Sequence, residues 1–320
     1  MSDEDHGSAQ PGGDGDAPAT GGDSTATDPA SQSAVEDAIP DLDADDRARE
    51  SGEPSHGADE DTPDDEPEHT PDDHPRSADL ETRHRIEAGV EKGITHLQGM
   101  HAEGRGTAFD YLLGEETIPS ADAAERAAAA HFLLADRPVV SVNGNVAALV
   151  PGEVVELAEV TGADLEVNLF NRTDERMQAI ADHLREHGAS EVKGLTADGR
   201  IPGLDHERAK VDADGIGAAD VVLVPLEDGD RAEALGAMDK TEIVIDLNPL
   251  SRSAQAATVP IVDNVVRAIP NITAHARELR EADRDTLERI VDEFDASATL
   301  DAAERAVREG GDGTDGAPVE

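Results

Sequence analysis

Apolar residues recur along the chain with two different spacings, which predict helices and strands in alternation. Ile86, Val90, Ile94 and Leu97 repeat at helical spacing and predict one amphipathic helix over 83–101. Segments rich in apolar and β-branched residues, as expected of buried parallel strands, lie at 138–142, 164–170, 192–195, 220–225, 242–246 and 259–262. Further helices are expected at 121–135 with Ser120 as N-cap, at 153–161, from 177 to near Gly188, and at 230–238, 264–280, 284–295 and 300–308.

Strands that alternate with helices form parallel sheets with right-handed crossovers. We therefore expect a Rossmann-like, doubly wound, mostly parallel α/β domain over 73–309. Residues 73–136 would be its N-terminal helical part, and 137–309 its core with the C-terminal helices. Ligands of such sheets bind beyond the carboxyl ends of the strands, so the segments that follow the strands are the first candidates for a site.

Charge changes the picture at both ends of the chain. There are 73 acidic and 26 basic residues, a formal net charge of -47. Residues 1–72 are rich in Asp, Glu, Gly, Pro, Ser and Thr, and we expect a disordered acidic tail there and a second one over 310–320. The remainder is acidic too, because 49 acidic and 23 basic residues follow position 77. Like charges in such excess repel one another, and molar salt screens this repulsion beyond roughly 3 Å. The charge therefore indicates a salt-rich cytosol, as in a halophile.

The same charge argues against nucleic acid and against anionic membranes as partners. The sequence has no Cys, so thiolate catalysis and Cys-ligated metals are excluded. No apolar run reaches the roughly 18 residues of a membrane span, and the N-terminus lacks a signal pattern. We expect a cytoplasmic protein.

Polar residues are dense after three of the expected strands. Asn143, Gly144 and Asn145 follow the first strand, and glycine permits a close backbone approach to a ligand. The segment 246–253 combines a carboxylate, an amide, hydroxyls and a guanidinium, and 225–231 holds three acids and Arg231. Each segment alone is equally compatible with a structural turn.

Common nucleotide and hydrolase motifs are absent, since the chain contains no GxxxxGK[ST] loop, no GxGxxG in the first βα unit, no HExxH and no GxSxG. Arginines are more informative. Arg83, Arg105 and Arg252 lie where polar or glycine-rich segments are densest. Charge-assisted contacts between arginine and phosphate would let an acidic protein bind an anionic substrate.

Many short segments occur in an order that is characteristic of one protein family. They are His74–Arg76, Arg83, Glu91–Ile94, Gly104–Leu112, Gly114–Glu115, Ile118–Pro119, Val140–Asn145, Ala148–Pro151, Glu166–Phe170, Arg172–Thr173, Ile201–Leu204, Pro225–Arg231, Asp246–Arg252 and Ile261–Asn264. Together, over about residues 72–295, these segments resemble the archaeal phosphopantothenate synthetase (4-phosphopantoate–β-alanine ligase) family, and we expect a haloarchaeal member.

This resemblance implies that ATP and 4-phosphopantoate form an acyl adenylate, which β-alanine converts to 4-phosphopantothenate and AMP. It also implies Mg²⁺ and a homodimer. The residues that match the family's ATP-binding positions are Arg83, Arg105, Asp246, Leu247, Asn248, Arg252, Ser253, Asp263 and Asn264. From position alone, Asn143, Gly144 and Asn145 are candidates for the pantoyl phosphate. The acids Glu227, Asp228 and Asp230 are candidates for Mg²⁺ or for the β-alanine ammonium.

Two alternatives stay open at this point. One is a ligase for unphosphorylated pantoate, although the sequence has no HxGH-like motif. The other is a nucleotide sensor without catalysis, since a Rossmann-like fold alone does not establish a reaction. No catalytic base for the amine can be assigned from the sequence.

Overall fold

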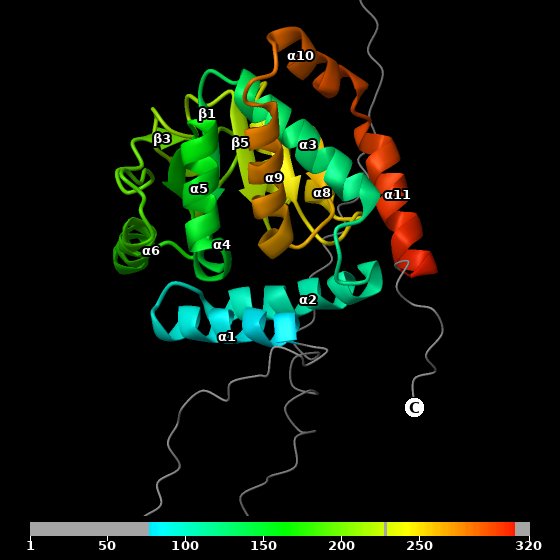
Figure 1. Cartoon of the computed structure of the whole chain (residues 1–320). Helices are drawn as coiled ribbons and strands as arrows, with labels where there is room; N and C mark the ends of the chain where they lie inside the picture. The colour runs from blue at the N-terminus through cyan, green and yellow to red at the C-terminus, as the bar shows by residue number, and fades with distance from the viewer. Residues whose placement is uncertain (1–76, 227–228, 311–320) are drawn as a thin grey trace, which may run out of the picture. The chain divides into compact units, whose positions relative to one another are not determined.

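Residues 83–101 belong to two helices, so the expectation of a single helix there was wrong. The computed structural model describes residues 77–226 and 229–310, which include α1 (Ser77–Glu91) and α2 (Leu97–Leu113). The backbone N–H groups of Ile94 and Thr95 both donate to the carbonyl of Gly89, at 2.8 and 2.9 Å, and close a tight turn. The apolar spacing continues through this turn because Ile94 is itself buried in the core. Figure 1 shows α1 and α2 side by side across one end of the α/β core.

The core contains a sheet of five parallel strands in the order β2-β1-β5-β6-β7. Val140 of β1 pairs with Leu165 of β2 on one side and with Leu223 of β5 on the other. The expected α/β fold with a mostly parallel sheet is therefore confirmed, whereas the expected tails at 1–72 and 310–320 lie, except for Gly310, outside the described residues. The strands are β1 (Pro138–Val142), β2 (Asp164–Val167), β5 (Val221–Pro225), β6 (Thr241–Ile245) and β7 (Val259–Ile261).

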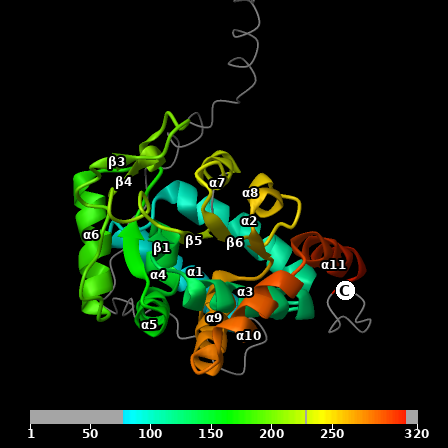
Figure 2. The same ribbon diagram turned by 90° about the horizontal axis from the view of Figure 1, so that it is seen from above.

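Helices cover both faces of this sheet, as a doubly wound fold requires. Val140 and Val142 pack into the larger apolar cluster, which includes residues of α3 (Pro119–Leu134), α5 (Pro151–Thr161) and α9 (Val265–Leu279). Val139 and Val222 point the other way and pack against Leu235 of α7 (Gly229–Gly236) and against the segment 199–219. Figure 2 shows α7 and α8 (Arg252–Ala256) on one side of the strands and α3, α5 and α9 on the other.

Two details of the expected elements need correction. Helix α3 starts at Pro119 after Ile118, so Ser120 lies inside the helix and is not its cap. Proline suits the first helical position because its φ is already helical and it has no N–H to satisfy. Residues 192–195 are not a strand: Lys193 makes a single bridge to Glu166, and the next N–H, of Gly194, donates to the Asp212 carboxylate instead.

Several short elements were not predicted from the sequence. They are α4 (Gly144–Leu149), α8, and the two-stranded antiparallel pair β3 (Gly199–Arg200) and β4 (Lys210–Val211). The remaining helices fall close to their expected positions. They are α6 (Asp174–Glu186), α10 (Arg284–Glu293) and α11 (Ala296–Glu309).

The order of the strands fixes where a ligand can enter. From β1 the chain moves to β2 on one side, and β5, β6 and β7 then add on the opposite side, so the direction of winding changes between β1 and β5. In open parallel sheets, the loops at the carboxyl ends of strands separate at this point and leave a crevice. No helix in the described ranges is long and apolar enough to cross a membrane.

Candidate active site

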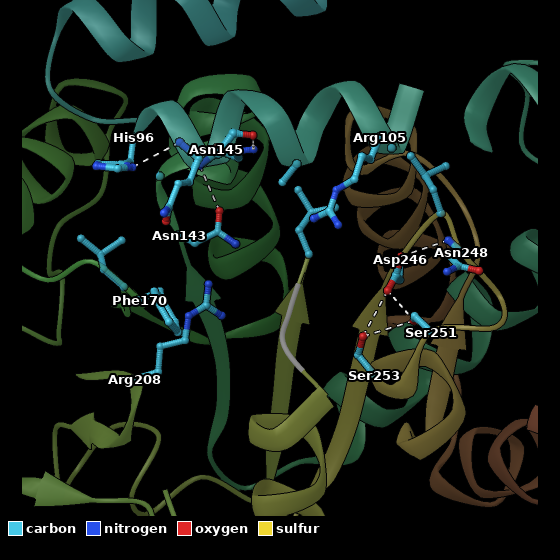
Figure 3. A pocket seen from close by; sticks show the side chains of 18 of the residues that line it. His96, Arg105, Asn143, Asn145, Phe170, Arg208, Asp246, Asn248, Ser251 and Ser253 are labelled. Carbon is cyan, nitrogen blue, oxygen red and sulfur yellow. Dashed lines mark hydrogen bonds between the residues drawn. The ribbon is translucent and has the colours of Figure 1, made fainter. Parts of the chain in front are cut away.

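A pocket of about 610 Å³ opens at the carboxyl ends of the strands, where the winding direction changes. This volume is within the range of about 300–1,000 Å³ that is usual for small-molecule sites. Its walls come from the segments that follow β1, β2, β5 and β6, together with one face of α2. Figure 3 shows these side chains converging on one space.

The loop after β6 is organised by the Asp246 carboxylate. Its Oδ1 accepts a hydrogen bond from the backbone N–H of Asn248 at 3.0 Å. Its Oδ2 accepts from the hydroxyls of Ser251 at 2.5 Å and Ser253 at 3.1 Å. Ser251 in turn caps α8 by accepting from the N–H of Ala254. One carboxylate thus sets the shape of the loop that forms this wall of the pocket (Figure 3).

The turn after β1 is held by two asparagines. Asn143 is the N-cap of α4, because its Oδ1 accepts from the N–H groups of Asn145 and Val146. Its Nδ2 donates to the carbonyl of Pro225 at 2.8 Å, which fastens this turn to the end of β5. Asn145 donates to the carbonyl of Gly99 at 2.9 Å and so joins the turn to α2. The expected turn at 143–145 is therefore the start of a helix.

Helix α2 forms a wall along the length of the pocket. Residues at helical spacing on one of its faces line the cavity: Gly99, Ala102, Arg105, Gly106 and Phe109. Three of these side chains are absent or small, which leaves room between the helix and the strand ends. A Cβ on Gly99 would lie 2.3 Å from Oδ1 of Asn145, so glycine at this position lets Asn145 bond the Gly99 carbonyl without a clash.

The charge of the pocket is opposite to that of the chain. Among the described residues, its lining includes four arginines, Arg105, Arg176, Arg208 and Arg252, but only one carboxylate, that of Asp246. Arg105 is exposed and makes no ion pair or hydrogen bond within the described part of the chain. Arg252 forms ion pairs with Asp230 at 2.7 Å and Glu233 at 2.8 Å. A local excess of guanidinium groups suits a ligand with several phosphates.

The residues expected from the sequence fall into three groups. The pocket brings together nine of them: Arg105, Asn143, Gly144, Asn145, Asp246, Leu247, Asn248, Arg252 and Ser253. Arg83, Asp230, Asp263 and Asn264 do not line it. Arg83 pairs with Asp79 on the exposed side of α1, and Asp230 reaches the rim through its ion pair with Arg252. Glu227 and Asp228 lie outside the described residues.

Asp263 and Asn264 belong to a buried polar network next to the pocket. Arg267 of α9 donates to both Asp263 and Asp110 at 2.5 Å, and Asn264 donates to Asp110 at 2.7 Å. This network ties the end of β7 and the start of α9 to α2. Glu103 lies beside it, and burial together with the charge of Asp110 raises the pKa of Glu103 to about 7, while a hydrogen bond from Asn145 opposes that rise. The network therefore holds α2 in place over the pocket.

One cluster elsewhere has the composition of a metal site. Asp122 and Glu125 of α3 and His275 of α9 each offer a ligand atom within 4.8 Å of the others. None of them lines the pocket. Burial raises the pKa of Glu125, and the neighbouring Asp263 raises it further. A cluster outside the pocket cannot supply the ligands of a nucleotide-bound cation.

Sequence reasoning missed three basic residues that line the pocket: His96, Arg176 and Arg208. His96 is at the start of α2, within a segment that was expected to be helical. Arg176 lies in the first turn of α6, and Arg208 lies in a short 3₁₀ helix (Glu207–Ala209) between β3 and β4. The sequence position of Arg176 could have indicated its role. The first turn of the helix that follows β2 lies at the same edge of the sheet as the loops after the strands.

The sequence matches a known family over most of its described length. The model of the family described as phosphopantothenate/pantothenate synthetase matches residues 120–310. A curated relative from Thermococcus kodakarensis, named 4-phosphopantoate--beta-alanine ligase, is 56% identical over 228 residues, which are 71% of this chain and 87% of the relative. A protein of the same name from Methanosarcina mazei is 51% identical over 237 residues, which are 74% of this chain and 93% of that relative. The chain therefore belongs to the phosphopantothenate/pantothenate synthetase family.

Proposed function

We propose that this chain is a ligase that condenses 4-phosphopantoate with β-alanine at the expense of ATP, a step of coenzyme A biosynthesis. The carboxylate of 4-phosphopantoate attacks the α-phosphorus of ATP, and pyrophosphate leaves. The amine of β-alanine then attacks the carbonyl carbon of the acyl adenylate. The C–N bond forms, AMP leaves, the amine loses a proton, and the product is 4-phosphopantothenate. The names of the curated relatives support both carbon substrates.

The observation that carries this proposal is the cationic pocket in a chain of net charge -47. Adenylation and acyl transfer develop charge on phosphate oxygens, and a protein accelerates them chiefly by positioning the reactants and stabilising that charge. Arginines that face a pocket at the carboxyl ends of parallel strands are suited to both tasks. A purely structural role would not require four of them around one cavity.

We assign the ATP to the side of the pocket formed by α2 and the β6 loop. Arg105 and Arg252 would contact phosphates there, and the loop of Asp246, Leu247, Asn248 and Ser253 would shape the nucleotide site. Asp263 and Asn264 would act indirectly, because their hydrogen bonds fix α2 and hence Arg105. Contact between Arg83 and ATP stays a prediction.

Mg²⁺ would accompany the triphosphate. This cation usually takes one or two carboxylates and completes its shell with water and substrate phosphates. Asp246 is the carboxylate that lines the described part of the pocket, and it fits this role because Oδ1 accepts a single hydrogen bond. Mg²⁺ would neutralise phosphate charge during the transfer. Asp230 is a further candidate for Mg²⁺ or for the β-alanine ammonium.

Three properties of the whole protein complete the proposal: a homodimer, a cytoplasmic location and adaptation to high salt, as in a haloarchaeon. The first is implied by the resemblance to the family. The other two are supported by the composition, because a charge of this size is best tolerated where salt screens it.

An assay that omits each of ATP, 4-phosphopantoate and β-alanine in turn tests the proposed reaction. We expect AMP and pyrophosphate only when all three are present, and release of ADP would overturn the adenylate route. Pantoate in place of 4-phosphopantoate tests the alternative that the family description also names. ATP that binds without any turnover would instead indicate a sensor.

A further inference from the structure

Arg176 has surroundings that are unusual for an arginine in this chain. From the first turn of α6, its Nε donates to the carbonyl of Ile94 at 2.9 Å and its Nη1 to the carbonyl of Asn171 at 3.0 Å. It is half-buried, and no carboxylate of the described residues pairs with it. Burial lowers the pKa of Arg176, because desolvation disfavours the charged guanidinium.

Gly144 allows this guanidinium to reach the pocket. A Cβ at position 144 would lie 2.5 Å from Nη2 of Arg176 and 2.4 Å from the carbonyl oxygen of Ile94. The guanidinium is therefore packed on the backbone of the β1 turn and held in one place by two carbonyls. A guanidinium carries five N–H donors, of which these two bonds use two, so the others remain for a ligand in the cavity.

Other donors lie at the same end of the pocket. His96 accepts a hydrogen bond from the N–H of Gln98 on Nδ1, which leaves the proton of the neutral ring on Nε2. The guanidinium of Arg208 is buried and lines the cavity beside Phe170. Figure 3 places His96, Phe170 and Arg208 on one side of the pocket and Arg105, Asp246 and Ser251 on the other. The cavity thus has two separate basic ends.

We propose that Arg176 is the residue that distinguishes 4-phosphopantoate from pantoate, by binding the phosphate of the acid substrate at this end of the pocket. This inference rests on the proposed function, because that reaction has two phosphate-bearing substrates whose reacting atoms must meet between the ends. With ATP at the β6 end, a phosphomonoester at the opposite end directs the carboxylate of the acid toward the α-phosphorus. The guanidinium of Arg176 then binds this phosphate.

The test compares Arg176→Gln with wild type on 4-phosphopantoate and on pantoate at saturating ATP and β-alanine. Arg185→Gln is the matched control, since Arg185 is on the same helix, is exposed, and pairs with Asp182. One charge-assisted contact corresponds to a loss of roughly 100-fold. We expect kcat/KM for 4-phosphopantoate to fall about 100-fold in Arg176→Gln, with kcat/KM for pantoate and KM for ATP unchanged. Because both acids are measured on one sample, the ratio is independent of the folded fraction.

An equal loss on both acids, or a rise confined to the KM for ATP, would overturn the inference. If Arg176→Gln is inactive, calorimetric titration of the same variant with 4-phosphopantoate decides: lost affinity with ATP binding retained supports the inference, and retained affinity overturns it. Wild type that binds 4-phosphopantoate in this titration yet forms no AMP would refute the proposed reaction while leaving the phosphate subsite in place.

Discussion

The hydroxyl of Ser251 donates to Oδ2 of Asp246 at 2.5 Å and connects the end of β6 to the cap of α8. Both residues line the pocket, so a bond within the loop also fixes a wall of the site. In Asp246→Asn the charge-assisted bonds from the two serines are lost, and we expect the KM for ATP to rise about 10- to 100-fold. Steady-state kinetics with ATP as the varied substrate measures this, and an unchanged KM would show that the loop is not part of the nucleotide site.

Arg105 is predicted to contribute to ligand binding and not to the stability of the fold. It is exposed and has no partner among the described residues, so its removal breaks no contact of the folded chain. We expect Arg105→Ala to lower kcat/KM for ATP at least 100-fold and to shift Tm by less than about 2 °C. Arg126→Ala is the control, since Arg126 pairs with Glu278 away from the pocket. Full activity of Arg105→Ala would remove Arg105 from the site.

Gly99 is predicted to be sensitive even to alanine. The new Cβ would meet Oδ1 of Asn145 at 2.3 Å, so the Asn145 side chain must give up its bond to the Gly99 carbonyl, or α2 must move. We expect a loss of about 1–3 kcal/mol in the free energy of unfolding, as for overpacking, together with reduced activity. Gly104→Ala, on the same helix with no atom near its Cβ, should be neutral or slightly stabilising. Equal effects of the two substitutions in denaturant unfolding would contradict the described packing.

Glu242 is predicted to make stability depend on pH. Burial raises its pKa from 4.5 to about 8, against an opposing effect of Arg231. Between these values the unfolded chain releases the proton and the folded chain keeps it, so the free energy of unfolding falls as pH rises. The slope from this group is at most about 1.4 kcal/mol per pH unit. In Glu242→Gln this contribution disappears, and the difference between the two unfolding curves should grow from pH 5 to pH 8 and then level off. A constant difference would contradict the shift.

Salt should stabilise the protein and raise its activity. The screening length shortens from about 10 Å at 0.1 M to 3 Å at 1 M, and repulsion among 73 acidic residues weakens accordingly. We expect Tm to increase steadily with KCl up to molar concentrations. The rate of the reaction should rise over the same range of KCl. Sucrose at matched viscosity controls for the effect of viscosity on that rate. A melting temperature that is independent of KCl would argue against salt adaptation.

The sequence was most informative about the strands and the segments directly after them. Runs such as Val139–Val142 and Ile243–Ile245 are apolar almost throughout. Such short apolar runs are typical of parallel strands that are buried on both faces of a sheet. Since parallel strands end at one edge of the sheet, the polar residues after β1 and β6 line one pocket, although they are far apart in the sequence.

Long-range and irregular features could not be predicted in this way. Arg176 contributes to the pocket through bonds to Ile94 and Asn171, and the contact with Ile94 spans 82 positions. The turn between α1 and α2 was hidden because Ile94 keeps the helical spacing while it packs from a turn. Asp263 matched the family's nucleotide segments, yet its side chain is 1% exposed and bonds Arg267. Sequence pattern alone does not distinguish a residue that touches a ligand from one that supports it.

Isotope transfer tests the central claim most directly. The enzyme is given 4-phosphopantoate labelled with ¹⁸O in the carboxylate, unlabelled ATP and β-alanine, and the phosphorus-containing products are analysed by mass spectrometry. If the carboxylate attacks the α-phosphorus in this pocket, one ¹⁸O atom appears in AMP and none in pyrophosphate. Label in inorganic phosphate with release of ADP would contradict the acyl adenylate on which the account depends.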